Sequence, residues 1–398
     1  MNQYFLDYYV KIKSVIHFPF WSEKEKFLIL EVHDQRTEGF LLSLDSEKNL
    51  NLETTWDDFS LARLSRQVRR HLQNWKVVVS ADSRLALTAI LPIKLEREAG
   101  LASSPLSSIE LENLLAQASA RIFTQVRGEA SRELGIEELD TILIDNRVSN
   151  FKVDGHHVMN PLEFRAKKID AVLELTLTTR AIFDHWKNFF SIGETKNFFF
   201  TESARAELFA LKKIRPLPLN LLILNREGHS ELFRLEKAAV GELVHRSKIK
   251  WFSNLIFESL TSTLGVSDPV ARKIYDLYLS KNLSPRLTRH FNLSLKPVFS
   301  SLFRHLENHP VKGPLYMDID LKLPPFIPKK QGGAILADLP LGDLLDQLGF
   351  RTDFTQWPWP NLGAFRHLAP FFEFYYNNEE LAINHWLRRR LHWLGSSR

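Results

Sequence analysis

The chain has 398 residues, enough for two to three domains with a sizeable core. Apolar residues make up 44% and charged residues 25%, a mix that excludes disordered, collagen-like and disulfide-scaffold chains. Cysteine is absent, which excludes thiol catalysis, thiolate zinc sites and disulfides. The first residues are aromatic and polar rather than a signal peptide, and no long apolar run follows. We therefore expect a cytoplasmic protein.

The positive charge is concentrated at the C-terminus. The net charge is +5, yet residues 384–398 contain four arginines and no carboxylate, so the rest of the chain is close to neutral. A general nucleic-acid surface is therefore not expected, and we predict no nucleic-acid partner. Glycine is scarce, with 16 residues, which leaves little material for glycine-rich phosphate loops.

The first part of the chain predicts a small sheet and one helix. Apolar runs at 27–31 and 39–44 predict two strands joined as a hairpin. Leucines and a valine at helical spacing predict a helix over 61–72. Residues 76–80 and 85–95 are predicted to be strands that pair with each other.

A small α+β insertion is expected next. Ser107-x-x-Glu110 is a capping-box pattern, and it precedes a long helix that runs past Ile122. Three strands are predicted to follow, at 141–145, 150–153 and 171–178, with a turn at Asp154-Gly155 and a helix from about Arg180. One helix and several strands between larger elements are typical of an inserted subdomain.

The second half repeats a strand–loop–strand pattern and then becomes mainly helical. Strands are predicted at 219–224, 231–235, 315–323 and 334–337, and helices at 251–264, 269–281, 295–308, 341–348, 369–376 and from 379 onward. Gly349 is a suitable C-cap for the fourth of these helices. The aromatic, proline-containing segment 355–363 is expected to be a rigid loop.

None of the common catalytic motifs occurs. The sequence lacks the glycine-rich phosphate and dinucleotide motifs, the G-x-S-x-G nucleophile elbow and the H-E-x-x-H zinc motif. His156-His157 favours a pair of surface residues over a metal site, and Gly332-Gly333 favours a turn over a phosphate cradle. We predict no catalytic residue and no metal ligand.

The final helix has an apolar stripe beside basic residues. The stripe comprises Ile383, Trp386, Leu387, Leu391 and Leu394, while Trp393 adds a second amphipathic ring and Arg388, Arg389 and Arg390 lie near or opposite it. A short basic helix with aromatic anchors is suited to lying in a membrane interface, with the arginines at anionic headgroups. The alternative is a terminal helix docked on the protein's own core, with its arginines in solvent.

Residues 91–190 resemble the small inserted subdomain of FtsA, the actin-like bacterial division protein. The resemblance depends on Leu91-Pro92-Ile93, the capped helix, Phe151-Lys152-Val153-Asp154-Gly155, Asn160-Pro161-Leu162 and the strand at 171–178. It implies an α/β fold of the actin-like (ribonuclease H-like) class, two-lobed, with a small α+β inserted subdomain. The implied divisions are an arm at 1–25, lobe segments at 26–93 and 183–376, the insertion at 94–182 and a membrane-targeting helix at 377–398.

The same resemblance implies a role in bacterial division. The partners it implies are the tubulin-like FtsZ, an anionic membrane surface bound by the final helix, and further copies of the chain. The expected location is cytoplasmic, peripheral at the inner face of the cell membrane.

The chain departs from this family where nucleotide should bind. At the first phosphate hairpin it has Glu31 and Asp34 with no glycine at hand, and at the second it has Asn225, Gly228 and Ser230 in place of an Asp with three glycines. Ala337, Asp338 and Leu339 replace the Thr-Gly-Gly of the adenosine loop. We therefore expect no cofactor, with ATP and Mg²⁺ binding lost or weak. Two alternatives remain: an adaptor like PilM of type IV pilus assembly, and an active actin-like ATPase or sugar kinase.

Overall fold

The structure is a computed structural model that describes residues 24–34, 36–60, 75–98, 100–190, 198–238, 241–319, 321–331, 334–353, 357, 361–376, 383–384 and 386–387. The predicted helix at 61–72, Gly332-Gly333, nearly all of the N-terminal arm and most of the aromatic loop and final helix lie outside these residues.

The first lobe is built on a five-stranded sheet with the order β3-β2-β1-β4-β9. Its strands are β1 (Glu25–Val32), β2 (Thr37–Leu44), β3 (Leu50–Trp56), β4 (Lys76–Ala81) and β9 (Phe198–Glu202). The first three form an antiparallel meander, and β4 and β9 continue the sheet in parallel with β1. Continuous apolar runs such as Phe27–Leu30 form central strands because both faces of the sheet are buried.

The second lobe repeats this arrangement. Its sheet has the order β12-β11-β10-β13-β15-β14, with the antiparallel meander first and the parallel strands after it. The strands are β10 (Leu219–Leu224), β11 (Ser230–Lys237), β12 (Glu242–Ile249), β13 (Gly313–Ile319), β14 (Lys330–Gln331) and β15 (Ala334–Asp338). Two sheets of the same strand order and direction are the two lobes of an actin-like fold, so the predicted fold class is confirmed.

A helical layer joins the two lobes. Helices α5 (Ser203–Ile214), α9 (Leu341–Leu348) and α10 (Asn361–Tyr376) share one apolar core with residues from both sheets. Helix α10 contacts β1 and β4 of the first lobe and β13 of the second, so it packs on strands of both lobes. The far side of the second sheet is covered by α6 (Asn254–Leu264), α7 (Asp268–Leu279) and α8 (Pro285–Glu307).

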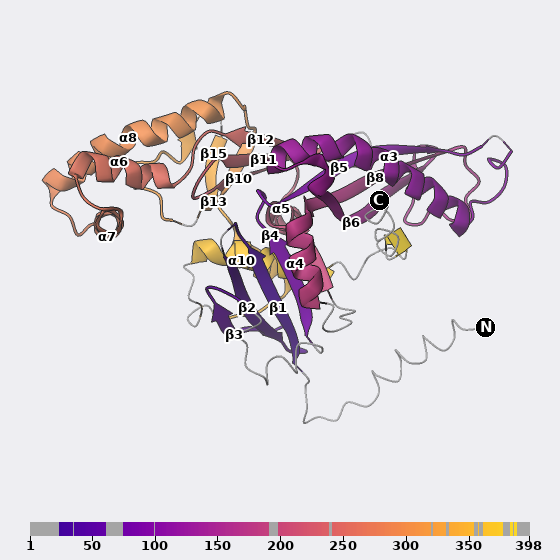
Figure 1. Ribbon diagram of the computed structural model, residues 1–398, viewed down its shortest axis with the longest axis horizontal. Helices are drawn as coiled ribbons and strands as arrows, with labels where there is room; N and C mark the ends of the chain where they lie inside the picture. Colours follow the sequence, from indigo (N-terminus) through magenta and orange to yellow (C-terminus); the bar gives the residue numbers. More distant parts are fainter. Residues whose placement is uncertain are drawn as a thin grey trace.

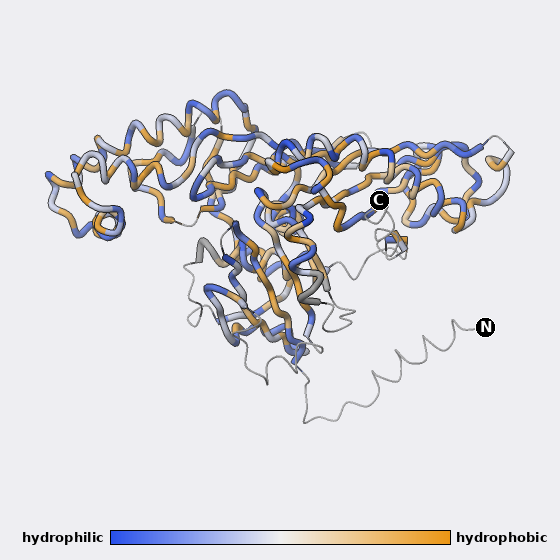
Figure 2. Tube along the Cα trace, viewed as in Figure 1, coloured by the Kyte–Doolittle hydropathy of each residue, from blue (hydrophilic) through white to orange (hydrophobic). Residues whose placement is uncertain are grey.

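The inserted subdomain has its own sheet and core. Strands β5 (Ala86–Glu96), β6 (Thr141–Val153), β7 (His156–His157) and β8 (Lys168–Thr179) form an antiparallel sheet of order β5-β8-β6-β7. It packs against α3 (Ser108–Leu134), which is followed by the short helix η3 (Glu138–Asp140). Helix α4 (Arg180–Phe190) follows β8, and its Trp186 is buried in the core of the first lobe. In Figure 1 this subdomain and the helices α6–α8 extend to opposite sides of the molecule. Figure 2 shows how strongly hydrophobic the strands of the first lobe are.

Several expectations about local structure are confirmed. Ser107 is the N-cap of α3, with its hydroxyl accepting a 3.2 Å bond from the Glu110 N–H, and Gly349 ends α9 with a φ of 72°. His156 and His157 are exposed. The segment 141–153 is one strand rather than two, with a register shift between Leu143 and Asp145 and another between Ser149 and Lys152, where Asn150 has a φ of 54°.

One predicted strand pairing is wrong. β4 and β5 do not pair, since β4 lies between β1 and β9 while β5 pairs with β8. The tight turn after β4, in which Leu85 N–H bonds to the Asp82 carbonyl at 2.8 Å, sends the chain out of the first lobe into the subdomain. The sequence also gave no prediction for β3, β9, α5 and β12.

Candidate functional site

A cleft lies where the carboxyl ends of the central strands of both lobes meet. Its cavity has a volume of about 850 Å³, and ligands of α/β folds commonly bind at such strand ends. Both hairpins, the end of β13 and helix α10 contribute to its lining, through Glu31, His33, Arg36, Arg226, Ile319, Arg366 and His367 among others. The cleft is therefore open in volume.

The first hairpin places one predicted residue in the cleft and the other outside it. Glu31 is 2% exposed and lines the cavity near the end of β1. Asp34 is exposed at the turn, where its carboxylate lies 3.3 Å from Arg84. The turn closes through a 2.9 Å bond from the His33 N–H to the Arg36 carbonyl.

The second hairpin closes through its own side chains. Asn225 is buried, and its Nδ2 donates to the His229 carbonyl at 2.8 Å. Gly228 has a φ of 78°, which suits the glycine of a tight turn. Ser230 is fully buried as the first residue of β11, and Arg226 is the turn residue that lines the cleft. The Asn225 side chain thus serves the turn, whereas the buried Ser230 hydroxyl has no hydrogen-bond partner among the described residues.

An arginine from α10 connects acidic groups of both lobes. The Arg366 guanidinium lies 3.6 Å from the Asp82 carboxylate, at the end of β4, and 3.5 Å from the Asp318 carboxylate, near the end of β13. It also lies 4.0 Å from Glu31. Asp82 and Asp318 lie at the ends of equivalent strands of the two sheets, so one cation spans the interface between the lobes. We call these four side chains the Arg366 cluster.

His367 is the second basic group from α10. Its Nδ1 lies 2.9 Å from Glu31 Oε1, and both side chains are buried. Burial raises the pKa of the Glu31 carboxyl, but the charge and hydrogen bond of His367 and the charge of Arg366 more than offset this, giving about 2. Burial lowers the pKa of His367, but Glu31 outweighs that effect and raises it. Glu31 is therefore ionised and paired at neutral pH.

Glu31, His33 and Glu38 each place one possible metal-ligand atom within 4.8 Å of the others. Imidazole and carboxylate groups can bind divalent transition metals. In this structure, however, Glu31 is paired with His367, and Arg36 lies 2.5 Å from Glu38. The cluster is therefore already compensated by protein cations.

The segment that would correspond to the adenosine loop also lacks a phosphate-binding backbone. Ala337 and Asp338 end β15, Leu339 is 6% exposed in the core, and Pro340 precedes α9. A buried leucine and a proline leave no glycine-lined approach for a ligand at this point.

Four residues of the predicted final helix are described, and they pack on the inserted subdomain. Leu387 is 2% exposed in the subdomain core, and Ile383 and Trp386 pack against that core. Asn384 is 4% exposed and bonds to the backbone of Val148. The remaining predicted membrane residues, Arg388, Arg389, Arg390, Leu391, Trp393 and Leu394, lie outside the described residues. No helix among the described residues is long and apolar enough to cross a membrane.

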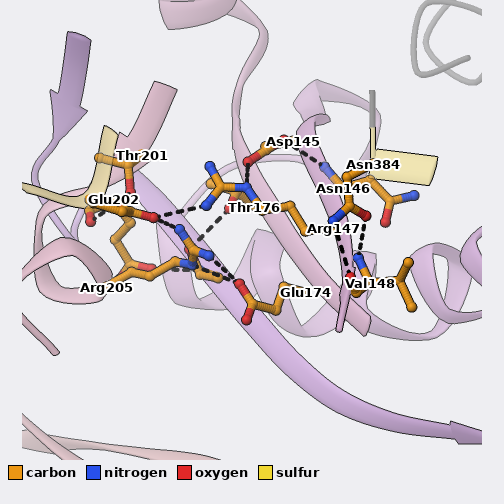
Figure 3. Close-up of polar contacts among 12 residues, drawn as sticks. Asp145, Asn146, Arg147, Val148, Glu174, Thr176, Thr201, Glu202, Arg205 and Asn384 are labelled. Atoms are coloured by element: carbon orange, nitrogen blue, oxygen red, sulfur yellow. Dashed lines mark hydrogen bonds and ion pairs between the residues drawn. The ribbon is translucent and has the colours of Figure 1, made fainter. Parts of the chain in front are cut away.

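A buried ionic network between the subdomain and the lobes was not predicted from the sequence. Arg147 of β6 lies 2.7 Å from Asp145 and 3.0 Å from Glu373 of α10. Arg205 of α5 pairs closely with Glu373 and with Glu174 of β8. Figure 3 shows Arg205 directed at Glu174, and Arg147 beside Asp145. The only signal in the sequence is a single charge within each apolar run, as in AVLELTLTT and FFEFYY.

Comparisons with known proteins identify no family, because no family model and no curated protein matches the sequence. Three solved structures are similar over most of their length. The PilM-PilN type IV pilus biogenesis complex has 10% sequence identity and a TM-score of 0.43, and the match covers 92% of this chain and 98% of that one. The ethanolamine utilization protein EutJ from Carboxydothermus hydrogenoformans has 8% identity and a TM-score of 0.31, over 90% of this chain and 92% of that one. The activator of the 2-hydroxyisocaproyl-CoA dehydratase from Clostridium difficile with bound ADPNP has 7% identity and a TM-score of 0.31, over 89% of this chain and 96% of that one. At these low scores, the fold assignment depends on the strand order of the two sheets.

Proposed function

We propose that this protein is an actin-fold adaptor that connects partners without turning over ATP. The observation that carries this proposal is the Arg366 cluster, in which a protein cation lies between Asp82 and Asp318. In the family that the sequence resembles, phosphate and Mg²⁺ bind between the two hairpins. A nucleotide would have to displace this guanidinium from its carboxylates and would then meet unpaired negative charges.

The electrostatics of the first hairpin support the same proposal. Glu31 has a pKa of about 2, so it stays ionised at neutral pH. Burial raises the pKa of Asp82, but the hydrogen bond of His33 and the charges of Arg366 and Arg84 hold it well below its usual range. Two buried carboxylates oppose the phosphates of ATP unless cations stay beside them.

A thermal-shift titration with Mg²⁺ and ATP tests the loss of nucleotide binding. A ligand present at 100 times its Kd stabilises the folded state by about 2.7 kcal/mol, which raises the Tm by several degrees. We expect an unchanged Tm at millimolar Mg·ATP. A saturable rise in Tm would favour the active ATPase or sugar kinase instead.

We further propose that the adaptor links the tubulin-like FtsZ to an anionic membrane at the inner face of the cell. Support comes from the sequence resemblance of residues 91–190 to FtsA and from the basic, tryptophan-containing final helix. Co-pelleting with FtsZ filaments tests the first link, with pilus assembly proteins as the comparison partners. Binding to the pilus proteins and not to FtsZ would favour the PilM-like alternative.

Vesicle pelleting tests the membrane link. We expect the full chain to pellet with vesicles that contain phosphatidylglycerol, and expect a chain that ends at Asn378 to stay in the supernatant. Equal pelleting of the two chains would contradict a role for the final helix. Since one short helix binds weakly, self-assembly of the adaptor would strengthen attachment through multivalency.

A further inference from the structure

The C-terminal segment is held against the outer edge of β6 by one side chain. The Val148 N–H donates to Asn384 Oδ1 at 2.8 Å, and Asn384 Nδ2 donates to the Val148 carbonyl at 3.1 Å. Figure 3 shows the Asn384 amide beside the Val148 backbone. A side-chain amide offers one acceptor and two donors, so it pairs with both polar groups of one residue as a neighbouring strand would.

Along this edge of β6, the described residues provide no further paired strand except at its end. β6 pairs with β8 along most of its length, and β7 pairs with it only at Lys152 and Val153. Backbone groups on an unpaired strand edge attract other chains. Val148 is 1% exposed with the segment docked, so a docked segment that lacked the Asn384 amide would leave the Val148 backbone groups buried and unpaired.

The apolar side of the contact uses the side chains that the membrane would need. Leu387 is 2% exposed within the core of the subdomain, and Ile383 and Trp386 pack on it. An interfacial helix binds a bilayer by burying such side chains among the lipid acyl chains. One set of side chains cannot occupy the protein core and the bilayer at the same time.

We propose that the β6 edge is a docking site for Ile383, Asn384, Trp386 and Leu387 of the same chain, and that docking there and membrane insertion exclude each other. Asn384 is the positioning residue that fixes the docked state. The inference rests on the proposed membrane function and says how that function is regulated. While the final helix is docked on β6 it cannot insert into a membrane, and it becomes available for insertion only when it leaves β6. The apparent membrane affinity is then lowered by the fraction of molecules that are undocked.

Two substitutions from opposite sides of the contact test this proposal. Asn384→Ala removes both hydrogen bonds from the tail side. Val148→Pro removes the backbone N–H that donates to Asn384 and leaves the C-terminal segment unchanged. A gain in membrane affinity in this variant therefore cannot come from a more apolar C-terminal segment. Asn146→Ala is the matched control, because Asn146 is also buried on β6 but bonds to Ser119 of α3 at 2.9 Å.

The first readout is the apparent Kd for phosphatidylglycerol vesicles by pelleting. We expect Asn384→Ala and Val148→Pro to lower it by about tenfold or more, the effect of losing one or two buried hydrogen bonds, and expect Asn146→Ala to match the unsubstituted chain. The second readout is hydrogen exchange of segment 141–150 without lipid, which should accelerate in Asn384→Ala. Equal Kd values for the unsubstituted chain and the three variants would overturn the proposal that docking and insertion exclude each other, and would leave the proposed membrane function in place. Absence of pelleting by all four proteins would overturn both.

Discussion

Arg205 is the arginine whose loss should most strongly destabilise the joint between the subdomain and the lobes. Its side chain is 11% exposed, and it pairs with Glu373, which is fully buried, and with Glu174. Burial raises the pKa of Glu174, but the charges of Arg205 and Arg147 outweigh that effect and lower it. Arg205→Met keeps much of the volume but removes the cation. Arg147 would then be left with Asp145, Glu174 and Glu373.

The expected loss in the free energy of unfolding follows from the carboxylates that remain without a cation. Breaking a buried ion pair by removing one partner costs about 3–5 kcal/mol, because the remaining charge is desolvated without compensation. We expect Arg205→Met to lower the free energy of unfolding by that amount at pH 8. The loss should shrink as the pH falls, because the pKa of Glu174 rises without Arg205 and its protonation then removes the unpaired charge.

Urea denaturation at pH 8 and pH 5 measures this loss. The double variant Arg205→Met/Glu174→Gln should recover at least half of the stability, because it removes a carboxylate that has lost its cation. Lys26→Met is the control, since it breaks an exposed 2.6 Å pair with Glu53 and should cost less than about 1 kcal/mol. A cost for Arg205→Met no larger than this control, or no recovery in the double variant, would refute the reasoning.

Three further predictions concern other parts of the molecule. Burial raises the pKa of Glu202 from 4.5 to about 7, so the folded state binds this proton more tightly than the unfolded state does. The protein should therefore lose about 3 kcal/mol of stability between pH 4.5 and 7, relative to Glu202→Gln, and denaturation across that pH range measures the loss. Arg97→Met should destabilise the protein by about 3 kcal/mol in urea, because the fully buried guanidinium bonds to Glu110 at 2.7 and 2.9 Å. Ser107→Ala should cost about 1 kcal/mol in the same assay, by loss of the α3 N-cap.

The parts of the fold that the sequence predicted are those governed by local chemistry. Apolar runs identified β1, β2, β10 and β11, and cap residues identified the start of α3 and the end of α9. The pairing of β4 with β1 and β9 depends on segments far apart in the chain, which a local pattern does not contain. Helix α10 begins at Asn361 rather than at 369 as predicted, inside the segment expected to be a rigid loop, and it continues through Pro370 because it packs between the lobes.

The candidate site was predicted only in part for a related reason. Glu31 could be recognised from its place near the end of a buried strand, but its partners His367 and Arg366 come from a helix more than 300 residues away. Asn384 carries no periodic signal, because an amphipathic stripe looks the same whether it faces lipid or protein. The role of Asn384 depends on its two hydrogen bonds to Val148, a residue far away in the sequence.

Isothermal titration calorimetry of the full chain with Mg·ATP tests the central claim most directly. The Arg366 cluster predicts no saturable heat, since its guanidinium stays between Asp82 and Asp318. Saturable binding with a micromolar Kd would show that the protein holds nucleotide and would contradict the account.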